Sequence, residues 1–133
     1  MSVVTLAQAS TIVDAALKKG RDTNCAPLTV AVLDAGGHLV AFKREDKSGL
    51  LRFDIAFGKA WGALGMGFGS RTLAARVAKT PQFFTMLVAA SQGRIVTNPG
   101  GWPQGRSRPG RELTGDADDF GLEAFDHTCY QES

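Results

Sequence analysis

The feature that most constrains the fold is a pair of short apolar segments joined by a two-glycine turn. Residues 28–33 predict a buried strand, because residues 30–33 form an apolar run that is too short for a helix. The turn Asp34-Ala35-Gly36-Gly37 follows, and its glycines can adopt positive φ without a steric penalty. Residues 38–44 alternate in polarity, which places Val40 and Ala41 on opposite faces. Together these segments predict an antiparallel β-hairpin over residues 28–44.

Helical periodicity occurs on both sides of this hairpin. Thr5 and Gln8 have capping-box spacing, and the apolar residues that follow predict a helix over residues 5–19 that ends between Gly20 and Asn24. A second helix is predicted over residues 53–65. One face of that helix carries Phe53, Ala56, Phe57, Ala60, Trp61 and Leu64.

The segments after residue 65 predict three further elements. Ser70 is a suitable N-cap for a short helix that ends at Ala78. Thr80 followed by Pro81 is typical of a helix start, and this helix should end near residue 91. Residues 94–97 predict a third short strand. One hairpin, this strand and several helices predict an α+β fold.

The size and charge of the chain exclude several classes of protein. A chain of 133 residues fits a single domain, here residues 1–133. A net charge of +2 predicts no nucleic-acid surface. No segment resembles a signal peptide or reaches the length of a membrane span, so we expect a cytoplasmic protein that does not contact a membrane.

The cysteines and histidines are too few and too scattered to predict a bridged or metal-bound scaffold. Cys25 and Cys129 are far apart in the sequence, and we expect both to be reduced thiols. The two histidines, His38 and His127, lack metal-ligand spacing, so no metal site is predicted.

Three motifs resemble those of a known family. They are AVLDAGGHLVAF at residues 31–42, followed by Arg44 and Asp46; FDIAFGKA at residues 53–60; and NPGG at residues 98–101. In this order and spacing they resemble the GlcG/HbpS family, which includes haem-binding proteins and the C-terminal domain of PduO-type proteins. The resemblance covers about residues 5–101. Residues 102–133 are atypical, because a segment rich in Gly, Pro and Arg stands where the family has two further strands.

The resemblance implies a profilin-like fold, in which helices pack on the faces of an antiparallel sheet. It also implies a homo-oligomer, often an octamer, and haem as a cofactor in some members. The large apolar residues of the predicted helices agree with an assembly built on helix faces. These residues are Trp61, Phe68, Phe83, Phe84 and Met86.

Four residues are candidates for a functional site. His38 follows the two-glycine turn, and a neutral imidazole there can ligate haem iron. Lys59 lies on an otherwise apolar helix, where a depressed pKa would suit a base or an anion anchor; the family motif also contains a lysine there. Asp34 and Arg44 flank the hairpin and can position a carboxylate or propionate group. Each of these residues also has a purely structural interpretation as a turn former or a surface charge.

Two functions are compatible with these candidates. The first hypothesis is a small-molecule-binding protein that takes haem or a related planar acidic ligand through His38. The alternative is a small enzyme without a cofactor that performs isomerase, lyase or proton-transfer chemistry on a small carbonyl or carboxylate compound. In that case Lys59 would be the base, and Asp34 and Arg44 would position the substrate.

Overall fold

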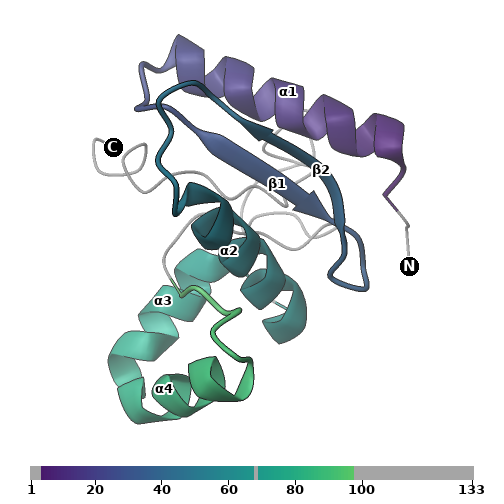
Figure 1. Ribbon diagram of the computed structural model, residues 1–133. Helices are drawn as coiled ribbons and strands as arrows, with labels where there is room; N and C mark the ends of the chain where they lie inside the picture. The colour runs from purple at the N-terminus through teal and green to yellow at the C-terminus, as the bar shows by residue number, and fades with distance from the viewer. Residues whose placement is uncertain (1–3, 68, 98–133) are drawn as a thin grey trace.

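The structure, a computed structural model, describes residues 4–67 and 69–97. It is an α+β fold in which a β-hairpin lies among helices, as predicted (Figure 1). The elements in chain order are α1 (Leu6–Asp22), β1 (Thr29–Leu33), β2 (Leu39–Arg44), α2 (Arg52–Met66), α3 (Ser70–Lys79) and α4 (Pro81–Ala90). The expectation of one domain over residues 1–133 stays a prediction, since the NPGG motif and the atypical tail lie outside the described residues.

The hairpin lies between α1 and α2, with one helix on each face. β1 and β2 pair antiparallel, and every residue of β1 is buried. Val30 and Val32 pack against the apolar face of α1, whereas Ala31 and Leu33 pack against α2. Because successive side chains of a strand point to opposite faces, a strand covered on both sides has to be apolar throughout. This arrangement confirms the predicted hairpin and the helices packed on its faces.

A β-bulge at Val40 interrupts the alternation expected in β2. Val32 pairs with Ala41 but Leu33 pairs with Leu39, so Val40 is passed over in the register. Val40 and Ala41 both pack against the cluster under α1. The prediction that these two residues face opposite sides is therefore wrong, because a bulge sets two residues of one strand opposite one residue of the other.

The capping box of α1 is present as predicted. The Thr5 hydroxyl oxygen accepts from the Gln8 amide at 3.1 Å, and the Thr5 amide donates to the Gln8 side chain at 3.0 Å. α1 continues to Asp22, so Gly20 lies within the helix rather than ending it. A Cβ at Gly20 would overlap the side chain of Leu28, so the glycine allows β1 to approach the helix closely.

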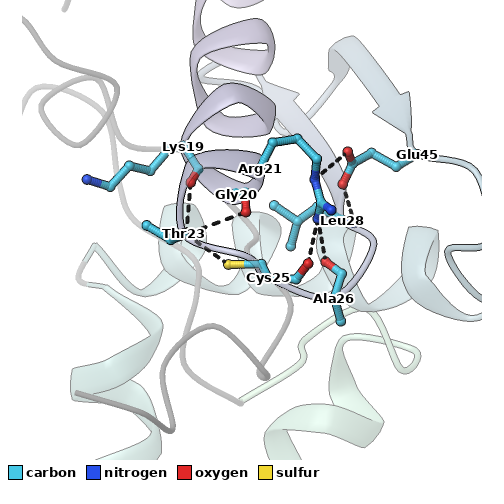
Figure 2. Close-up of polar contacts among 8 residues, drawn as sticks. All are labelled: Lys19, Gly20, Arg21, Thr23, Cys25, Ala26, Leu28 and Glu45. Carbon is cyan, nitrogen blue, oxygen red and sulfur yellow. Dashed lines mark hydrogen bonds and ion pairs between the residues drawn. The ribbon is translucent and has the colours of Figure 1, made fainter.

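Arg21 and Glu45 connect the end of α1 to the open end of the hairpin through an ion pair and hydrogen bonds (Figure 2). Arg21 donates to the carbonyl oxygens of Cys25 at 2.7 Å and Ala26 at 3.0 Å. Its Nε lies 2.9 Å from one carboxylate oxygen of Glu45, while the other accepts from the Leu28 amide at 2.7 Å. These contacts satisfy the backbone of the connection between α1 and β1 and fix where β1 begins.

Cys25 lies in this connection and is not a free thiol. Its sulfur lies 3.2 Å from the Thr23 hydroxyl (Figure 2), and the residue is disulfide-bonded. The expectation of a reduced Cys25 is therefore wrong. Cys129, the other cysteine of the sequence, lies outside the described residues, as does His127.

The two later helices are close to their predicted bounds. The N-cap of α3 is Gly69 rather than Ser70, and α4 begins at Pro81 as expected. Residues 94–97 do not form the predicted strand. The Val96 amide donates instead to the carbonyl oxygen of Gly58 in α2 at 3.2 Å, and Ile95 fills a cluster with Leu73 and Phe84. Among the residues described, no strand lies beside this segment to pair with it.

No helix within residues 4–67 and 69–97 combines the length and the apolar character that a membrane crossing requires.

Candidate functional site

A cleft of about 570 Å³ opens between the hairpin turn, α2 and the loop after α4. Its volume falls within the range of about 300–1,000 Å³ that is typical of small-molecule sites. The lining residues are Gly36, Gly37 and His38 from the turn, Phe53, Asp54, Phe57 and Trp61 from α2, and Gln92, Gly93 and Arg94 from the loop.

An aromatic stripe on α2 forms one wall of this cleft. Phe53, Phe57 and Trp61 are spaced four residues apart, which places them along one side of the helix. The Phe53 and Phe57 ring centroids are 6.0 Å apart, and Phe42 of β2 meets Phe53 edge-on at 5.1 Å. Helical periodicity predicted that these rings share one face with small residues of α2. In the structure the alanines contact β1, while Phe57 and Trp61 pack against the Leu33–Ala60 cluster and also line the cleft.

The turn side of the cleft is organised by Asp34. Its Oδ1 accepts hydrogen bonds from the amides of Gly36 and His38, both at 2.9 Å, and lies 3.2 Å from Nδ1 of the His38 ring. The backbone N–H of His38 is the main reason that the pKa of the Asp34 carboxyl lies below its ordinary value. The His38 side chain is 82% exposed, so its ring is accessible at the edge of the cleft.

Gly37 allows the turn to come close to the aromatic wall. Its φ of 82° lies in the left-handed region, and a Cβ there would stand 3.0 Å from Nε1 of Trp61. A larger residue at this position would strain the turn and push it away from Trp61, so this glycine sets the separation of two cleft walls.

Arg94 brings a positive charge to the cleft. Its guanidinium carbon lies 5.6 Å from the centroid of the Trp61 ring, which is within cation–π range. Sequence reasoning missed this residue and considered Arg44 as the partner for a ligand carboxylate. The only local signal was the position of Arg94 directly after Gly93, a glycine with a φ of 76° in the turn that follows α4.

The four sequence-predicted candidates occupy different places. His38 lines the cleft, and Asp34 contacts the ring of His38 without being a lining residue itself. Arg44 lies at the other end of the hairpin, where it pairs with Thr29, and is exposed. The structure therefore brings Asp34 and His38 together but does not place Arg44 beside them.

Lys59 is only 1% exposed and is one of the largest fully buried side chains among the described residues. It lies two positions from both Phe57 and Trp61. Successive helical residues turn by about 100°, so it projects from the side of α2 opposite the aromatic stripe. The catalytic roles assigned to Lys59, Asp34 and Arg44 stay predictions.

Metal-ligating side chains do not gather in the part of the chain that the structure describes. No group of three or more His, Cys, Asp or Glu residues there could hold a metal ion. Among the described residues that line the cleft, His38 is the one whose side-chain nitrogen can ligate a metal.

The hairpin between two helices makes this an α+β protein, and the cleft beside the hairpin turn has the size of a small-molecule site. The chain belongs to the HbpS-like family. The model of this family, described as "Haem degrading protein HbpS-like", matches residues 4–111. This match confirms the resemblance found in the sequence. A comparison with curated proteins gives no match.

Solved structures share the fold. Klebsiella pneumoniae protein ORFY is 24% identical with a TM-score of 0.70, covering 94% of this chain and 77% of that one. PduOC in complex with haem is also 24% identical with a TM-score of 0.70, covering 80% and 75%. A double mutant of Streptomyces reticuli HbpS is 22% identical with a TM-score of 0.66, covering 90% and 82%. At these identities the likeness establishes the fold alone.

Proposed function

We propose that this chain is a small-molecule-binding protein that takes haem, or a related planar acidic ligand, in the cleft beside the hairpin turn. The observation that carries the proposal is the accessible imidazole of His38 at the edge of a cleft walled by aromatic rings. Membership of the HbpS-like family and the likeness to the PduOC–haem complex support haem as the ligand.

The residues of the cleft fit haem chemically. Flat apolar rings such as Phe57 and Trp61 suit the faces of a macrocycle, and their burial of apolar surface is favourable. The guanidinium of Arg94 suits the carboxylate of a propionate group. Haem, when bound, would supply an iron centre, and the imidazole of His38 would be the side chain that holds it.

Different residues of the cleft have different roles in this proposal. The aromatic stripe excludes water and contacts the ligand plane, while Arg94 orients its acidic edge. Gly37 holds the turn close to Trp61, so that His38 stands at the margin of the same cleft. In this proposal Arg94, rather than Arg44, binds the carboxylate of the ligand.

A haem titration monitored at the Soret band tests this proposal. We expect saturable binding at one haem per chain, with affinity reduced by about 10–100-fold or more in His38→Ala, since a ligand donor is removed. Lys59→Met is the matched control, because it changes α2 on the side away from the cleft and should retain the wild-type spectrum. Binding without defined stoichiometry, or equal binding by His38→Ala, would contradict the proposal.

We also infer that the chain forms a homo-oligomer, for which the family resemblance suggests eight copies. Phe83 and Met86 on α4 are 55% and 72% exposed, which is unusual for large apolar side chains spaced one turn apart. The other residues that prompted this expectation contribute differently. Phe84 is buried and Trp61 lines the cleft, while Phe68 lies outside the described residues.

The cytoplasmic location expected from the sequence stays a prediction. The disulfide at Cys25 does not favour it, because such bonds persist mainly in oxidising compartments.

A further inference from the structure

We propose that Asp34 is a positioning residue that fixes the His38 ring with Nδ1 toward the hairpin turn, and so leaves Nε2 as the nitrogen that meets a ligand. The role of Nε2 in binding a ligand rests on the proposed function. Its structural part, the orientation of the ring, holds for the ligand-free protein as well.

The first support is the set of contacts at one carboxylate oxygen. Oδ1 of Asp34 accepts from the amides of Gly36 and His38 at 2.9 Å each, which ties the carboxylate to the backbone of the turn. The same oxygen lies 3.2 Å from Nδ1 of His38. Because the backbone holds the carboxylate, the ring adjusts to the carboxylate rather than the reverse.

The second support is the packing of the ring over Gly36. A Cβ at Gly36 would stand 2.9 Å from both Cε1 and Nδ1 of His38, closer than van der Waals contact allows. The absence of a side chain at this position therefore gives the ring the space in which it meets Asp34. An Asx turn alone requires only the two backbone hydrogen bonds, so the contact with the ring goes beyond what turn formation needs.

The chemistry follows from what a carboxylate can do. An ionised carboxylate only accepts hydrogen bonds, so a neutral His38 must carry its proton on Nδ1 to bond with Asp34. The lone pair then resides on Nε2, and that nitrogen is free to act as a ligand. A carboxylate behind a ligating histidine fixes both the tautomer and the ring direction.

Two substitutions separate positioning from turn formation. Asp34→Ser keeps a hydroxyl that can accept from the backbone of the turn but is too short to hold the ring. Asp34→Asn keeps a side-chain oxygen at the same distance from the backbone, so it can still accept a hydrogen bond from the His38 ring. It is therefore the conservative variant that should restore the wild-type behaviour. Asp22→Ser on α1, which removes a surface carboxylate that contacts Lys18, is the control for loss of charge.

The direct readout is the tautomer of His38 in the haem-free protein. Nitrogen NMR at mildly alkaline pH reports which ring nitrogen of His38 carries the proton. We expect the Nδ1–H form in the wild type, Asp34→Asn and Asp22→Ser, and a shift toward Nε2–H in Asp34→Ser. Haem affinity should fall by about 10–100-fold in Asp34→Ser, as for other residues that orient a metal ligand, and should be largely restored in Asp34→Asn.

The outcomes distinguish this inference from the proposed function. A wild-type tautomer and wild-type haem affinity in Asp34→Ser would overturn the positioning role, even if His38→Ala abolished haem binding. A shifted tautomer in Asp34→Ser together with unchanged haem binding by His38→Ala would uphold the orientation by Asp34 and reject haem ligation by His38. If Asp34→Ser fails to fold, Gly36→Ala provides the same test, since its Cβ would displace the ring, and an unchanged tautomer there would overturn the inference.

Discussion

The carboxyl of Asp34 couples the stability of the hairpin turn to pH. Its pKa is lowered in the folded chain, mainly by the hydrogen bond from the His38 amide, so the ionised form binds the turn better than the protonated form does. A group with a depressed folded pKa stabilises the protein above its unfolded pKa of about 4, and this stabilisation is lost as the pH falls through the folded value.

We therefore predict that Asp34→Asn is less stable than the wild type at neutral pH and that the difference shrinks below about pH 4. Urea unfolding of both proteins at a series of pH values measures this difference. A constant difference across the acid range would show that ionisation of Asp34 does not contribute to stability.

Individual site residues were predictable where their chemistry is local. Asp34 and His38 are four residues apart in one glycine-rich turn, so the sequence alone made both candidates. Arg94 was not predictable, because it reaches the cleft only when the loop after α4 packs beside Trp61. The aromatic stripe has the same helical spacing as core residues, so periodicity could not separate cleft from core.

Helix α2 contains two glycines that provide a matched test of its packing. A Cβ at Gly58 would overlap the Val96 side chain and stand 2.7 Å from the Arg94 carbonyl oxygen. At Gly65 a Cβ would meet no atom of the described residues within 4 Å. Both positions lie inside the same helix, so the helical propensity gained by an alanine is similar at the two sites.

We predict opposite signs for the two alanine substitutions. Gly58→Ala should lower the free energy of unfolding by about 1–3 kcal/mol, because the Arg94–Val96 segment must move. Gly65→Ala should raise it by about 0.5–1 kcal/mol. Chemical denaturation measures the free energy of unfolding of both variants. Equal destabilisation of the two would show that close packing at Gly58 does not cause the loss of stability.

The elements that the sequence predicted correctly carry their signals locally. The capping box of α1, the glycine turn and Pro81 at the start of α4 each act within a few residues. The failures depend on distant partners. The bulge at Val40 reflects how β2 meets the α1 cluster, and residues 94–97 lack a strand partner among the described residues.

The exposed apolar surface of α4 predicts how the chain behaves in solution. If Phe83 and Met86 pack against another copy, then Met86→Glu should bury a charge in the interface and weaken assembly by at least about tenfold in the dissociation constant. Thr11→Glu adds the same charge on exposed α1 and should leave assembly unchanged. Sedimentation velocity at micromolar concentration measures both variants. A wild-type chain that sediments only as a monomer would reject the assembly.

The location of the ligand is the central claim for the molecule as a whole, and paramagnetic NMR tests it most directly. Ferric haem broadens the amide signals of nearby residues, and zinc protoporphyrin serves as the diamagnetic control. We expect broadening confined to the hairpin turn, the aromatic side of α2 and residues 92–94, with the signals of α1 unaffected. Broadening centred on α1 or on the exposed face of α4, with the signals of Gly36, Gly37 and Gly93 unchanged, would contradict this claim.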